Sequence, residues 1–136
     1  MIQRIQSIWL LLAAACAFAG FKLSYYSGLK TNDATLQQLN ALSTMLLMLT
    51  TITVGVLALL TIFSYKNRSL QLKLCLLGIV LEAVLIFLYY REVNTFIQGT
   101  YSLAALLHSI IILAFVLAAR GINKDEKLIK TSNRLR

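Results

Sequence analysis

LLGIVLEAVLIFLYY, the stretch from Leu76 to Tyr90, is apolar throughout except for one carboxylate, Glu82. A helix rises about 1.5 Å per residue and the hydrocarbon core of a bilayer is about 30 Å thick, so a spanning helix needs roughly 17–25 residues. Backbone polar groups in lipid must be paired within the segment, which favours helices. The chain has four apolar runs of suitable length, at residues 5–21, 41–65, 74–90 and 101–119.

The composition also indicates a membrane protein. Of the 136 residues, 59% are hydrophobic and 13% are charged, and none is proline. Soluble domains carry about 25% charged residues. The first run also resembles a cleavable signal peptide, because Arg4 precedes it and Ala17-Phe18-Ala19 ends it. We favour a first helix that is retained over one that is cleaved.

Basic residues flank the four runs unevenly and predict their orientation. Arg4, residues 66–73 and residues 120–136 carry most of the lysines and arginines, whereas the opposite side has only Lys22, Lys30 and Arg91. Cytoplasmic segments are enriched in such residues. We therefore predict an all-α, integral membrane four-helix bundle, up-down-up-down, with both termini cytoplasmic.

The connections on the outer side are too short for a folded domain. The tyrosine pairs Tyr25-Tyr26 and Tyr89-Tyr90 are expected at the outer membrane interface, where aromatic rings anchor. Asn32 or Asp33 is expected to cap a helical turn that continues into the second spanning helix.

We predict a spanning domain over residues 1–120 and a basic juxtamembrane tail with a short helix over 121–136. Gly121 is expected to end the fourth helix, and Asn123 to cap the short one. The tail could contact a protein partner or anionic lipid, or its charge could serve orientation alone. The candidate contact residues are Arg120, Lys124, Lys127, Lys130, Arg134 and Arg136.

The two ends of the chain together resemble a known family. MIQRIQSIWLLLAA at the start and INKDEKLIKTSNRLR at the end are similar to the membrane family catalogued as domain of unknown function 4293, which occurs in Bacteroidota. The resemblance covers the full chain. It implies a bacterial inner-membrane protein, but it implies no activity, cofactor or site residue.

Glu82 and His108 are predicted to form a buried polar pair. Counted from the outer ends of the third and fourth helices, they lie about 12 Å and about 10 Å deep. The short connection 91–100 makes these helices antiparallel neighbours. We expect Thr50 and Ser109 to complete a polar cluster at similar depth. The pair is either a structural hydrogen bond between helices or a functional proton site, because intramembrane ionisable groups often mark pathways.

Helical spacing predicts which faces point inward. Cys75, Gly78, Glu82 and Tyr89 share a stripe on the third helix. On the first helix, small residues recur at the spacing that lets membrane helices approach closely. These residues are Ala13, Cys16, Ala17 and Gly20.

Several kinds of chemistry find no support in the sequence. Cys16 and Cys75 are expected roughly 15 Å apart in depth, whereas a disulfide needs α-carbons within about 7 Å. One histidine and two separated cysteines provide no zinc site. No phosphate-binding loop is present, and the net charge of +8 suits lipid head groups better than nucleic acid. We expect no cofactor, metal or enzymatic activity.

Two function classes remain. The first is a non-enzymatic accessory or interaction subunit of the inner membrane, with the bilayer and a membrane or cytoplasmic protein as partners. The alternative is a small proton-coupled transporter that uses Glu82 with His108. Transport that survives Glu82→Gln would exclude the transporter.

Overall fold

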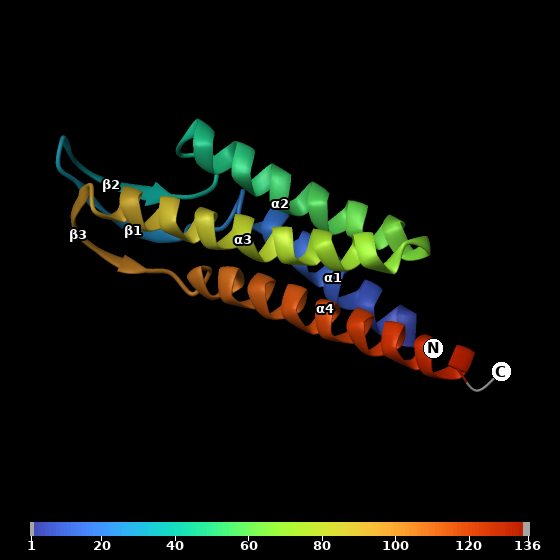
Figure 1. Ribbon diagram of the computed structural model, residues 1–136. Coiled ribbons are helices and arrows are strands. Elements are labelled where there is room, and N and C mark those ends of the chain that lie inside the picture. The colour runs from blue at the N-terminus through green and yellow to red at the C-terminus, as the bar shows by residue number, and fades with distance from the viewer. Residues whose placement is uncertain (1, 135–136) are drawn as a thin grey trace.

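The computed structural model describes residues 2–134 and shows a helical bundle with a small sheet at one end (Figure 1). Both chain ends lie at the opposite end of the bundle from the sheet. In chain order the elements are α1 (Ile2–Ala19), β1 (Tyr26–Lys30), β2 (Asp33–Leu39), α2 (Met45–Phe63), the 3-10 turn η1 (Ser64–Lys66), α3 (Arg68–Val93), β3 (Phe96–Tyr101) and α4 (Ala105–Arg134).

The four helices form a ring in which each packs mainly against two others. α1 contacts α4 and α2, and α3 contacts the same two helices. The small residues of α1 face the centre of the bundle, as the sequence predicted, and large residues fill the space between the helices. The fully buried residues at the centre include Leu10, Ala13, Val54, Ala58, Cys75, Ile111, Phe115, Ala118 and Ile122.

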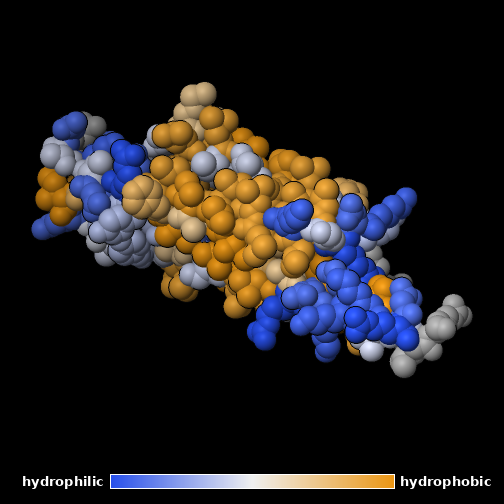
Figure 2. Space-filling model, in the orientation of Figure 1, coloured by the Kyte–Doolittle hydropathy of each residue, from blue (hydrophilic) through white to orange (hydrophobic). Residues whose placement is uncertain are grey.

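Within residues 2–134, three helices are long and apolar enough to cross a membrane: Met45–Lys66 (α2 with η1), α3 and α4. The apolar part of α1, Ile5–Ala19, is shorter, so its crossing stays a prediction. Many large apolar side chains point outward, and they form a belt between two hydrophilic ends (Figure 2). Soluble monomers rarely expose so large an apolar patch. The protein is therefore suited to a membrane.

The prediction of an all-α fold is wrong, because residues 26–39 and 96–101 form a three-stranded antiparallel sheet. The strand order is β2-β1-β3. Gly28 on β1 pairs with Gly99 on β3, and a Cβ on Gly28 would lie 2.8 Å from the Cα of Gly99. The expected helical turn capped by Asn32 or Asp33 is also wrong, since Asp33 begins β2. Backbone pairing of β2 with the adjacent strand β1 outweighs the local capping preference here.

The helix end predicted at Gly121 is wrong as well. α4 continues without a break to Arg134, so Asn123 lies inside the helix rather than at a cap. Ile122 and Asp125 are buried in this part of α4, and tertiary packing extends the helix past the glycine. The division into a spanning domain over 1–120 and a tail over 121–136 stays a prediction.

Candidate functional site

Glu82 on α3 and His108 on α4 contact each other inside the bundle. Nδ1 of His108 lies 2.6 Å from Oε1 of Glu82, which is hydrogen-bonding distance. Glu82 is 0% exposed and His108 is 6% exposed. The contact that the sequence predicted between the two residues is present, and both are removed from solvent.

The pair is positioned by the inward stripes of two antiparallel helices. Cys75, Gly78, Glu82 and Tyr89 are all buried on α3, so the predicted stripe is confirmed. α4 begins at Ala105, so His108 lies one turn, about 5 Å, inside its sheet-facing end. The imidazole is thus nearer to the end of its helix than the sequence estimate placed it.

Two tyrosine rings cover the pair on the sheet side. The Tyr25 and Tyr89 rings are stacked with centroids 4.3 Å apart. The His108 ring lies 5.4 Å from Tyr25 and 4.9 Å from Tyr89, centroid to centroid. Tyr25 also meets Tyr101 of β3 edge-on at 5.9 Å. The residue before β1 and the end of α3 therefore place an aromatic cover over the end of the helical core, and Tyr101 of the sheet packs against it.

Neither predicted companion of the pair belongs to it. The Thr50 hydroxyl donates to the carbonyl of Leu46 on its own helix, and Ser109 is exposed. The threonine next to it, Thr51, is buried, and its hydroxyl donates to the Leu47 carbonyl. A one-residue step turns a side chain by about 100° around a helix, which explains why the neighbour of Thr50 faces inward.

Glu82 has an oxygen atom without a partner. Oε2 is buried and accepts no hydrogen bond in the structure. Cys16 on α1 and Tyr89 lie within electrostatic range of this carboxyl. Among the described residues, no group of three or more His, Cys, Asp or Glu could hold a metal ion. The arrangement can bind a proton or a hydrogen-bond donor, and Cys16 beside it is a free thiol.

Tyr25 lies outside the spanning helices, and its surroundings shift the pKa of its hydroxyl. Burial, and then the neighbouring Tyr101, raises the pKa of the Tyr25 hydroxyl above its ordinary value. The ordinary value is about 10, so Tyr25 is neutral at physiological pH. A neutral ring can stack on Tyr89 without placing charge beside Glu82.

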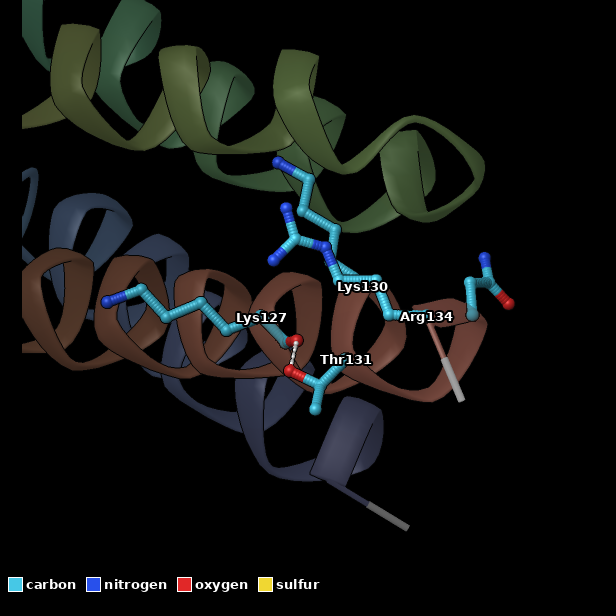
Figure 3. A pocket seen from close by; sticks show the side chains of 5 residues that line it. Lys127, Lys130, Thr131 and Arg134 are labelled. Atoms are coloured by element: carbon cyan, nitrogen blue, oxygen red, sulfur yellow. Dashed lines mark hydrogen bonds between the residues drawn. The ribbon is translucent and has the colours of Figure 1, made fainter. Parts of the chain in front are cut away.

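A second candidate site is the last part of α4, residues 120–134, which we name the basic extension. Lys127, Lys130 and Arg134 line a hollow in its surface together with Thr131 and Asn133. Lys130 and Arg134 extend side by side from the helix, and Lys127 points elsewhere (Figure 3). Arg120, Lys124, Lys127, Lys130 and Arg134 are all exposed, whereas Arg136 lies outside the described residues.

The basic extension is attached to the start of α1. Nε2 of Gln6 donates to Oδ2 of Asp125 at 2.7 Å, and this contact is buried. A Cβ on Gly121 would lie 2.9 Å from Cγ of Gln6, so the glycine gives this side chain room. Sequence reasoning missed the contact, since Gln6 and Asp125 carry no pattern beyond their polarity within otherwise apolar faces.

Fold and site together define a small multi-helix membrane protein with a buried Glu–His pair and a basic helical extension. The family described as a domain of unknown function, DUF4293, matches residues 2–135, and the chain belongs to it. The resemblance of the two ends is thereby confirmed. No curated protein and no solved structure matches the chain.

Proposed function

We propose that the protein is a non-enzymatic accessory subunit of a bacterial inner membrane, and that its basic extension docks an acidic surface of a partner protein. The observation that carries the proposal is the geometry of this extension. It continues a candidate spanning helix as one unbroken element and presents its cations to solvent. A rigid helix of this kind offers a preformed surface, which lowers the entropic cost of binding.

Apolar side chains beside the cations favour a protein partner over a purely orienting charge. Leu128 is 52% exposed and Ile129 is 45% exposed, and both lie between Lys127 and Lys130. Of the three cations that line the hollow, Lys130 is paired with Glu126 at 2.7 Å, which leaves Lys127 and Arg134 available to a partner there. Protein interfaces combine apolar anchors with charge complementarity.

The distribution of basic residues supports the cytoplasm as the partner's location. Lys66 and Lys73 are exposed in the turn and helix start between α2 and α3. That turn lies at the same end of the bundle as both chain ends (Figure 1). Concentrated lysine and arginine are typical of the cytoplasmic face, which supports termini on the inside.

Copurification from native membranes tests the proposal. Truncation after Gly121 is unsuitable because it removes the buried Ile122 and Asp125. The better variant is Lys127→Glu with Arg134→Glu, which keeps the buried face. Its matched control is Lys22→Glu with Lys30→Glu, which changes the charge equally at the other end of the molecule. Protease accessibility of the C-terminus verifies that both variants keep their orientation.

The expected result is one stoichiometric protein that copurifies with the wild type and the control but falls at least tenfold in the Lys127/Arg134 variant. Equal recovery of that protein with all three chains contradicts docking on the basic extension. Enrichment of anionic lipid alone, lost in the same variant, assigns the extension to the membrane surface and also contradicts the proposal.

A second candidate function is proton-coupled transport through Glu82. The buried Oε2 supports this function because it has no hydrogen-bond partner. Intramembrane carboxylates that are free to accept a proton often belong to proton pathways. Glu82→Gln is nearly isosteric and is expected to abolish proton-driven flux in proteoliposomes. Flux equal to that of the wild type excludes the role of Glu82.

A further inference from the structure

We propose that Glu82 and His108 form a buried proton-binding site, in which Glu82 is a neutral carboxylic acid whose Oε1–H donates to Nδ1 of His108. The inference concerns the charge state of this pair. It is independent of the basic extension and of any partner that binds there.

The distance between the two side chains requires a proton. Oε1 and Nδ1 are 2.6 Å apart, and two lone pairs at that separation would repel each other. Oε2 has no partner, so a proton on it would be a buried donor without an acceptor. With Oε2 unprotonated, three arrangements satisfy the contact: a neutral acid with a neutral imidazole, a carboxylate with an imidazolium, and a carboxylate with a neutral imidazole protonated at Nδ1. The first two carry no net charge, and the third leaves one negative charge in the bundle.

A net negative charge is the least favourable of these arrangements. The titratable side chains that the structure places against the pair are Cys16 from α1, Tyr89 from α3 and Tyr25 from the connection before β1. Each of them is neutral or, if ionised, negative. None of these three supplies positive charge, so an unbalanced carboxylate would remain uncompensated in a poorly polarisable surrounding.

The orphaned oxygen distinguishes the two neutral arrangements. In the carboxylate–imidazolium pair, Oε2 would be a charged acceptor, buried and without a donor. In the acid, Oε2 is an uncharged carbonyl oxygen, and leaving it unpaired costs less. The geometry therefore favours the proton on Oε1 and a neutral imidazole that carries its own proton on Nε2.

Nitrogen NMR of the wild-type chain tests this assignment without any substitution. The sequence has one histidine, so protein labelled with 15N-histidine gives signals from His108 alone. In lipid bilayers at neutral pH, the expected spectrum shows one protonated nitrogen, Nε2, and one unprotonated acceptor, Nδ1. Two protonated nitrogens would establish the ion pair, and a proton on Nδ1 alone would establish the charged pair; either result overturns the proposal.

Infrared spectroscopy provides an independent readout on the carboxyl group. The wild type is expected to show a carboxylic acid C=O band at neutral pH that shifts in D2O and disappears in Glu82→Gln. Glu92→Gln and Asp125→Asn are matched controls, the second because Asp125 is also buried, and both should retain the band. A wild-type spectrum without the band contradicts a neutral Glu82.

The nitrogen spectrum of Glu82→Gln also distinguishes the neutral acid from the ion pair. In Glu82→Gln, the amide N–H can donate to Nδ1 as the acid does, so the His108 nitrogen signals should keep the wild-type pattern. If Glu82 is instead ionised and holds an imidazolium, the glutamine variant releases a proton from His108 and one nitrogen signal changes state. That change would contradict the proposal.

Discussion

Gln6 and Asp125, which lie 119 positions apart in the sequence, are joined by a buried hydrogen bond of 2.7 Å. The bond links the start of α1 to the basic extension of α4. It lies at the same end of the bundle as the exposed cations. The extension therefore has an internal attachment, and its direction is set by packing as well as by helix continuity.

Asp125→Ala should loosen this attachment. The substitution leaves the amide of Gln6 buried without an acceptor, which costs about 1–3 kcal/mol. We expect a lower midpoint of thermal unfolding and a broader distance distribution between spin labels on the basic extension and on α2. Asn133→Ala, at an exposed position, is the control. A narrow, unchanged distribution in Asp125→Ala would show that the attachment does not hold the extension.

Gly78→Ala should disturb the contact between α3 and α4. A Cβ at this position would lie 2.6 Å from Cε1 of the Phe115 ring, so the ring must move. Overpacking of this kind typically costs about 1–3 kcal/mol. The midpoint of unfolding in detergent should fall, and Phe115→Leu in the same chain should restore part of it. Ala83→Val, on an exposed position of α3, controls for bulk alone. Equal midpoints for Gly78→Ala and the wild type would contradict close packing at this point.

Gly28→Val should open the sheet and leave the helices folded. The added side chain meets the backbone of β3 at Gln98 and Gly99, which has no flexible end that can yield. Amide hydrogen exchange across β1 and β3 should accelerate at least tenfold, whereas exchange in α2 and α3 should not change. Thr100→Ala, at an exposed position of β3, is the control. Protection of β1 in the valine variant would indicate a different strand pairing.

Tyr25 gives the aromatic cover a dependence on pH. Its pKa is raised by burial and then by Tyr101, so its neutral form is favoured in the folded chain. This contribution to stability is fully present below the ordinary value of about 10 and is lost as the pH rises through the higher folded value. NMR of 13Cζ-labelled tyrosine should show Tyr25 titrating at higher pH than in the unfolded chain.

Tyr101→Phe is expected to lower the titration midpoint of Tyr25 slightly, because it removes the smaller of the two causes. Tyr25→Phe assigns the signal by deleting it. A Tyr25 signal that titrates at or below its midpoint in the unfolded chain would be incompatible with the partly buried position of the ring.

The helical core and the polar pair could be predicted from the sequence because both depend on regular spacing. Glu82 and His108 fall at matching depths once two helices are antiparallel, and the stripe from Cys75 to Tyr89 follows the helical period. The sequence points to Thr50 whereas the structure buries Thr51, because a small error in helical phase moves a side chain to another face. The prediction that Ser109 joins the cluster is wrong because side chains of adjacent helix residues point about 100° apart, so Ser109 faces away when His108 faces inward.

The sheet could not be predicted with the same means. β1 pairs with β3 across more than sixty residues of sequence, and neither segment alternates strongly between apolar and polar residues. Its clearest signal is the Gly28–Gly99 match, which is visible only once the strands are aligned. The helix end expected at Gly121 failed because local propensity is weaker than the burial of Ile122 and Asp125.

Photo-crosslinking from the basic extension is the most direct test of the proposed function. A photoreactive amino acid at Leu128, which is 52% exposed, is activated in living cells, and Val84, 44% exposed on α3, serves as the control position. The account predicts one discrete protein adduct from position 128 that disappears when Lys127 and Arg134 are changed to glutamate, with none from position 84. Only lipid adducts from position 128, or a protein adduct that is indifferent to those charges, would contradict it.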